Sequence, residues 1–197
     1  MGRACWLLLS LLALDARAAE TYRIEPEQTR VSFDVRRYGV HWIGARFRQL
    51  AGGFIVDRTG SGNLIDVSVR TDSLEGLDSG WNRRLRSSEW LDTQRFPQMR
   101  FHSTHVEFRY DGSAVAVGQL SLHGVSRPVL LEISRLDCPA PQPSCGFTAH
   151  TSVRRSDFGL PHGFWVAGDA VEISIAGVAT RQDSRLTAAS TPPSSPN

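Results

Sequence analysis

Hydrophobic and polar residues alternate with a period of two along much of this chain, a pattern typical of β-strands with one buried face. The clearest case is residues 118–134, GQLSLHGVSRPVLLEIS, where two alternating runs meet near Gly124 and Pro128. Gly124 can adopt a left-handed backbone, and Pro128 fixes its own φ and lacks a backbone donor. We therefore predict a β-hairpin here, or at least a sharp corner.

The same alternation predicts strands elsewhere in the chain. They cover residues 29–38, 44–57, 65–69, 99–110, 114–122, 129–136, 146–155 and 169–179. A bulge or bend is expected within the second of these, at Gly52 and Gly53. Short connections make the strands antiparallel, and a sheet of this size protects its edges by closing. Roughly eight or nine strands are expected in all, so the predicted fold class is all-β, a closed antiparallel β-barrel with a possible cavity. A barrel of eight strands holds either packed side chains or one small ligand.

One helix is predicted after the N-terminal segment, over residues 78–91, where the alternation stops. Ser79 is a possible N-cap, and Trp81 and Leu85 share one face. Three arginines occupy much of the opposite face: Arg83, Arg84 and Arg86. Such a group can bind the anionic head of a ligand, although a solvated helix face is the alternative.

The two ends of the chain differ in composition from the predicted barrel. Residues 6–14 are rich in leucine but too short to span a bilayer, and Ala16-Arg17-Ala18 has the form of a cleavage site. We predict a signal peptide over residues 1–19, with a short buried helix or an uncleaved anchor as alternatives. A barrel domain over 20–180 and a polar, disordered tail over 181–197 complete the predicted organisation. The mature protein is then periplasmic or secreted, without a transmembrane anchor.

Export changes how the cysteines are interpreted. Cys138 and Cys145 enclose the sequence CPAPQPSC, and thiols oxidise in secretory compartments. A disulfide is favoured over a metal site or a redox pair, because both of these usually have closer cysteine spacing.

The distribution of charge and the positions of histidine and serine residues limit the classes of function that the sequence supports. All 22 basic residues are arginine, and 20 acidic residues are spread throughout, so no basic surface for nucleic acid is indicated. His102 and His105 are expected on opposite faces of a strand, where they cannot share a metal ion. Ser126 lies in no nucleophile motif. No metal, cofactor or catalytic residue is predicted, but a site assembled across strands in a hydrolase-like or metal-dependent periplasmic enzyme remains an alternative.

Several segments together resemble one family. SLHGVSRPV at 121–129 is similar to a hairpin of the YceI-like polyisoprenoid-binding proteins, which are exported bacterial barrels. Further similar segments follow the family order: VSFDVRRYGV at 31–40 with GARF behind it, LRSSEWLDTQRFPQMRFHST at 85–104, and RRSDFGLP at 154–161. The resemblance covers about residues 22–179.

The resemblance implies a lipocalin-like, antiparallel eight-stranded β-barrel that shelters or carries a long isoprenoid or fatty-acyl molecule and has no catalytic activity. The apolar strand faces supply the ligand-binding candidates: Phe33, Val35, Val67, Val69, Phe101, Leu120, Leu122, Val129, Leu131, Phe147, Val171 and Ile173. The alternative for each of these residues is that it packs in an ordinary filled core. In that case the protein would bind no ligand and would have a structural or stress-response role in the cell envelope. A homodimer is possible.

The chain also departs from the family. Many relatives carry Arg-Asp-x-His-Leu on the helix, where this chain has WNRRL at 81–85, and a frequent histidine after the first strand is Arg37 here. Any head-group contact made by that acid or histidine does not carry over.

Overall fold

The structure is a computed structural model that describes residues 19–37, 41–57, 62–138, 142–161 and 168–182. Nearly all of the predicted signal peptide and nearly all of the predicted tail lie outside these residues. The described chain forms these strands: β1 (Glu20–Ile24), β2 (Arg30–Arg37), β3 (His41–Phe47), β4 (Leu50–Val56), β5 (Leu64–Arg70), β6 (Leu74–Glu75), β7 (Gln98–Phe108), β8 (Ala114–Leu122), β9 (Val125–Asp137), β10 (Ser144–Arg154) and β11 (Ala170–Arg181). Its helices are α1 (Ser79–Arg86) and the short 3₁₀ helices η1 (Pro26–Gln28), η2 (Thr71–Ser73) and η3 (Ser156–Phe158).

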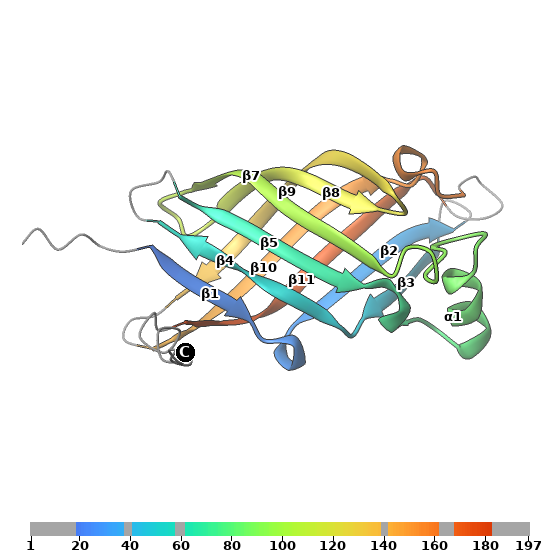
Figure 1. Ribbon diagram of the computed structural model, residues 1–197, viewed down its shortest axis with the longest axis horizontal. Helices are drawn as coiled ribbons and strands as arrows, with labels where there is room; N and C mark the ends of the chain where they lie inside the picture. Colours follow the sequence, from blue (N-terminus) through green and yellow to red (C-terminus); the bar gives the residue numbers. More distant parts are fainter. Residues whose placement is uncertain (1–18, 38–40, 58–61, 139–141, 162–167, 183–197) are drawn as a thin grey trace, which may run out of the picture.

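The strands form one antiparallel sheet in the order β1-β4-β5-β7-β8-β9-β10-β11-β2-β3-β6, and pairing of β1 with β11 closes it. Three of the barrel strands are bent, and each consists of two consecutive segments: β1 and β2, β3 and β4, and β5 and β6. The segments β3 and β4 pair with β2 and β1 on one side and with β6 and β5 on the other, so each set of two segments acts as one strand. Eleven strands therefore make an eight-stranded, elongated barrel (Figure 1). The predicted all-β, lipocalin-like barrel with one short helix is confirmed.

The helix α1 covers one end of the barrel (Figure 1). Its N-cap is Asp78, whose carboxylate accepts a hydrogen bond from Trp81 N at 2.8 Å, so the prediction that Ser79 caps the helix is wrong. The predicted helix over 78–91 is also too long. After Arg86 the chain turns on the Ser87 carbonyl, which accepts from Trp90 N and Asp92 N.

The β8–β9 connection is a two-residue turn in which His123 and Gly124 have φ values of 53° and 76°. Two consecutive positive φ values are characteristic of a type I′ hairpin, so the predicted hairpin is present. Pro128, however, does not mark its corner. It lies within β9 opposite Gln119 as a non-hydrogen-bonded pair, and β9 begins to pair with β10 only at Glu132. The missing donor of Pro128 therefore breaks no ladder hydrogen bond.

Three further boundaries differ from the sequence-based expectation. The predicted strand over 44–57 breaks at residues 48–49 and not at the two glycines. Gly53 instead permits close strand pairing, because a Cβ there would lie 2.0 Å from Tyr22 O. The strand β1 was not predicted. Arg181, assigned to the tail, belongs to β11 and pairs with Tyr22.

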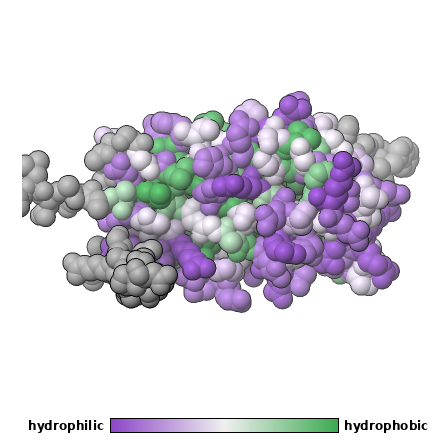
Figure 2. Space-filling model, in the orientation of Figure 1, coloured by the Kyte–Doolittle hydropathy of each residue, from purple (hydrophilic) through white to green (hydrophobic). Residues whose placement is uncertain are grey.

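Side chains alternate between the inside and the outside of the barrel. In β8, for example, Ala114, Ala116, Leu120 and Leu122 are buried, whereas Gln119 is exposed. The face drawn in Figure 2 is mainly hydrophilic, with hydrophobic areas between the hydrophilic residues. The apolar face of nearly every strand therefore turns toward the barrel axis.

Candidate ligand-binding site

The interior of the barrel holds two adjoining cavities. The first has a volume of about 120 Å³, and the second, at the end covered by α1, about 90 Å³. Both are lined by Val31, Met99 and Ile173, so they adjoin one another inside the barrel, whose interior we call the lumen. We call them the first chamber and the second chamber.

The wall of both chambers is almost entirely apolar. Aliphatic and aromatic side chains make up most of it, and its polar side chains among the described residues are Thr29, Thr151 and Arg155. Water gains few hydrogen bonds in such a space, whereas a hydrocarbon chain fits its chemistry.

All twelve side chains predicted to bind a ligand lie on this wall. Those of the first chamber are Val67, Val69, Phe101, Leu120, Val129, Leu131 and Phe147, those of the second are Phe33, Val35, Leu122 and Val171, and Ile173 lines both. Period-two alternation places them there, because the inward positions of a closed barrel face a common axis. Their contact with a ligand stays a prediction.

The second chamber is closed by aromatic side chains from α1 and the turns behind it. Trp81 and Trp90 both line it, with ring centroids 5.6 Å apart in an edge-to-face arrangement. Leu85, on the same face of α1 as Trp81, is buried beside them. The helix thus contributes its apolar face to the lumen.

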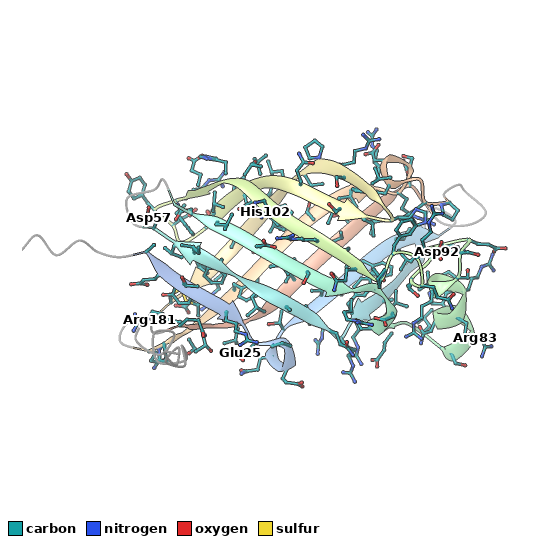
Figure 3. All side chains as sticks on the ribbon, in the orientation of Figure 1. Glu25, Asp57, Arg83, Asp92, His102 and Arg181 are labelled. Carbon is teal, nitrogen blue, oxygen red and sulfur yellow. A yellow bond between two sulfur atoms is a disulfide. The ribbon has the colours of Figure 1, made fainter. Side chains whose placement is uncertain are left out.

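The three helix arginines do not converge on one point. Arg83 is exposed and points away from the barrel in Figure 3. The Arg84 guanidinium lies 5.8 Å from the centroid of the Trp90 ring. Arg86 donates a hydrogen bond to the Leu74 carbonyl, and that short contact turns it back onto the barrel. This arrangement assembles no shared site from the three groups.

The sequence-based interpretation missed Arg155, which follows directly after β10. Its side chain is 4% exposed, lines the second chamber and has its guanidinium 4.7 Å from the centroid of the Trp90 ring. Its Nη1 donates to Gly168 O at 3.3 Å. Burial lowers the pKa of Arg155, and the nearby charge of Asp169 offsets part of this effect. Alternation could have revealed it, since Thr151, Val153 and Arg155 occupy successive inward positions.

A second polar group lies on the outside of the barrel. The Asp66 carboxylate on β5 accepts from Arg100 Nε at 2.8 Å and lies 3.2 Å from His102 Nδ1, both on β7 (Figure 3). The hydrogen bond from Arg100 lowers the pKa of Asp66. Contrary to expectation, His102 and His105 are both exposed, because a register shift between Ser103 and His105 breaks the alternation.

Candidate catalytic groups are positioned for ordinary structural contacts. Ser126 Oγ lies 2.7 Å from Ser121 Oγ on the exposed side of the hairpin, and His123 Nδ1 lies 3.2 Å from Phe158 O. Within the described ranges no group of three or more His, Cys, Asp and Glu side chains could hold a metal ion. No helix in the same ranges is long and apolar enough to cross a membrane.

The structure pairs Cys138 with Cys145 in a disulfide, as the spacing predicts. Cys145 lies at the start of β10 and is completely buried, whereas Cys138 follows the end of β9 and is exposed. The bond therefore fastens the β9–β10 connection at the end of the barrel opposite α1.

Comparison with known proteins agrees with this architecture. Residues 22–179 match the YceI-like domain family. The YceI protein of Salmonella arizonae is 32% identical over 180 residues, which cover 87% of this chain and 94% of that protein. A relative from Serratia proteamaculans is 31% identical over 176 residues, covering 85% and 91%.

Solved structures show the same fold at lower identity. BcnA of Burkholderia cenocepacia superimposes with a TM-score of 0.71 and 18% identity over 80% of this chain and 99% of that one. A polyisoprenoid binding domain from Saccharophagus degradans gives a TM-score of 0.60 and 13% identity over 82% and 98%. The fold thus defines a lipocalin-like, eight-stranded barrel around an apolar lumen. This chain belongs to the YceI-like family.

Proposed function

We propose that this protein is an exported lipid-binding protein that holds a long isoprenoid-like or fatty-acyl chain inside its barrel. The observation that carries the proposal is the lumen, whose two chambers are lined almost entirely by apolar side chains. The related domain from Saccharophagus degradans is described as polyisoprenoid binding, which supports the same class of ligand.

Burial of hydrocarbon supplies the affinity in this proposal. Each buried CH₂ group contributes roughly 0.8 kcal/mol, so a twenty-carbon tail contributes on the order of 16 kcal/mol before the costs of ordering the ligand. Few polar contacts are then needed. The protein acts by shielding the chain from water and carrying it, with no chemical step.

Export is part of the proposal and rests on the N-terminal sequence. The leucine-rich run over residues 6–14 and the small residues before residue 19 favour a cleaved signal peptide. The Cys138–Cys145 pair also suits an oxidising compartment. N-terminal sequencing of the mature protein from the producing cell tests this part, and a chain that still begins at Met1 contradicts it.

Lipid binding is tested with delipidated protein and a fluorescent long-chain probe, cis-parinaric acid. We expect saturable binding with one site per barrel and displacement of the probe by a long-chain polyprenol. If neither cis-parinaric acid nor the polyprenol binds, the proposal is contradicted. A variant that fills the first chamber, Ala149→Trp, is expected to bind weakly, while His150→Trp on the exposed side of the same strand binds normally.

A further inference from the structure

The lumen has one charged side chain among its described lining residues, and this is Arg155. Placing a guanidinium beside an apolar cavity is costly unless the charge is compensated by hydrogen bonds or an opposite charge. Most arginines extend to water and cover apolar surface only with their stems. Arg155 does not, because only 4% of it is exposed.

The backbone and the ring of Trp90 hold Arg155 in place. Arg155 N donates to Asp169 O at 2.9 Å, and Arg155 O accepts from Leu160 N at 3.0 Å. The guanidinium carbon lies 4.7 Å from the centroid of the Trp90 ring. A guanidinium over an aromatic ring is attracted by the face of the ring, and its N–H donors lie in the plane of the guanidinium.

The surroundings of Arg155 are apolar on the chamber side. Trp81, Phe158 and Leu160 line the same chamber, and Phe158 is almost completely buried. The Asp169 carboxylate is near enough for its charge to offset part of the burial of Arg155, and it also accepts from Ser156 N and Ser156 Oγ at 2.8 Å each. In such a low-dielectric place a hydrogen bond between two opposite charges is stronger than in water.

We propose that Arg155 binds an oxyanion head group, a carboxylate or a phosphate, of a lipid whose tail extends from the second chamber into the first. The inference rests on the proposed lipid-binding function. It adds that the bound lipid has an anionic head group and lies in one orientation in the lumen. The head lies at the α1 end, beside Trp81 and Trp90. The tail passes Val31, Met99 and Ile173, which line both chambers.

The test compares two probes with the same hydrocarbon chain, cis-parinaric acid and its methyl ester, of which only the acid can carry a negative charge. We expect wild-type protein to bind the acid about 10- to 100-fold more tightly than the ester, the range for a hydrogen bond to a charged group. Arg155→Met should abolish this preference, so that the variant binds the acid and the ester with similar affinity. Arg154→Met, the same change at the exposed neighbouring position, should retain it.

The outcomes separate this inference from the function on which it rests. If wild type binds both probes equally, or if Arg155→Met keeps the preference, Arg155 has no role in head-group binding and lipid binding still stands. If neither probe binds wild type, both proposals are wrong. Competition by a polyprenyl phosphate and by the corresponding polyprenol shows whether a phosphate head is preferred in the same way.

A measurement on wild type alone covers the case in which Arg155→Met does not fold. A fatty acid labelled with ¹³C at its carboxyl group is titrated by NMR in the bound state. A carboxylate beside Arg155 should show a pKa below that of the free acid, whereas a carboxyl group buried in an apolar lumen without a cation should show a raised pKa. The raised value overturns the assignment.

Discussion

Trp81 and Trp90 meet edge to face, with ring centroids 5.6 Å apart, at the end of the barrel that α1 covers. Trp90 is 8% exposed, so its ring is part of the core as well as of the chamber wall. Loss of a buried tryptophan removes contacts and leaves a cavity, at a cost of roughly 3 to 5 kcal/mol. We expect Trp90→Ala to lower the free energy of unfolding by this amount in urea denaturation.

The same substitution should also speed ligand exchange, because Trp90 links the turn after α1 to the second chamber. Stopped-flow release of cis-parinaric acid measures this rate. Glu89→Ala at the exposed neighbouring position is the control, and surface changes of this kind usually alter stability by less than about 0.5 kcal/mol. Equal stability of the two variants contradicts the assigned role of Trp90.

Ile173 lies where the two chambers adjoin, and a larger side chain there should obstruct the lumen. We predict that Ile173→Trp shortens the longest chain that the barrel accepts, since the tail can no longer pass from one chamber into the other. A series of fatty acids of increasing length, measured by probe displacement, shows the limit. Ser174→Trp points outward and should leave the length profile unchanged. Identical profiles for the two variants exclude a continuous binding path.

The Cys138–Cys145 disulfide closes a short loop between β9 and β10. If the restriction of the unfolded chain is its main effect, closing a loop of this length stabilises by roughly 2 to 3 kcal/mol. The double variant with serine at both positions should lose that free energy of unfolding. Reductant should destabilise wild type and have no effect on the variant. A wild type that is insensitive to reductant argues against the bond.

Asp66 should contribute a small, pH-dependent stabilisation. Because Arg100 lowers the pKa of Asp66 in the folded state, the contribution is present above the unfolded value of 3.8 and is lost as the pH falls through the folded value. Arg100 is exposed and Asp66 is partly exposed, so the effect on stability is small and decreases with salt. We expect Asp66→Asn to melt slightly below wild type at pH 7 and together with it near pH 2.

The control for this prediction is a double-mutant cycle with Arg100→Gln, measured at pH 7. The two single changes and the double change should give nearly the same melting temperature, because each removes the same pair. Additive effects show that Asp66 gains its stabilisation elsewhere, for example from His102, which lies 3.2 Å away.

Much of the fold follows from alternation, since each inward position of a strand such as β8 or β11 can be read directly from the sequence. The number of strands predicts that the sheet closes, but the strands that close it could not be identified, because β1 is short and its pairing with β11 joins opposite ends of the chain. Pro128 was misinterpreted for a related reason, since a proline is tolerated where its missing donor faces no ladder partner. Such partners are set by tertiary structure.

The candidate site also has one part that could be predicted from the sequence and one part that could not. The apolar wall could be predicted, because hydrophobic side chains at inward positions have no other place in a closed barrel. The position of Arg155 at the α1 end of the lumen could not be predicted. The role assigned to Arg155 depends on its contact with Trp90, which lies 65 positions earlier in the chain. The two residues are in contact because the turns behind α1 fold over the end of the barrel. The helix arginines, which do stand together in the sequence, separate in space.

Native mass spectrometry of the mature protein, purified from the cells that produce it, tests the central claim most directly. We predict a species heavier than the polypeptide by the mass of one lipid, which is released on unfolding in organic solvent and identified in the extract. Delipidated protein incubated with a long-chain polyprenol should regain one molecule per barrel. A protein that shows only the polypeptide mass, both as purified and after this loading, contradicts the account.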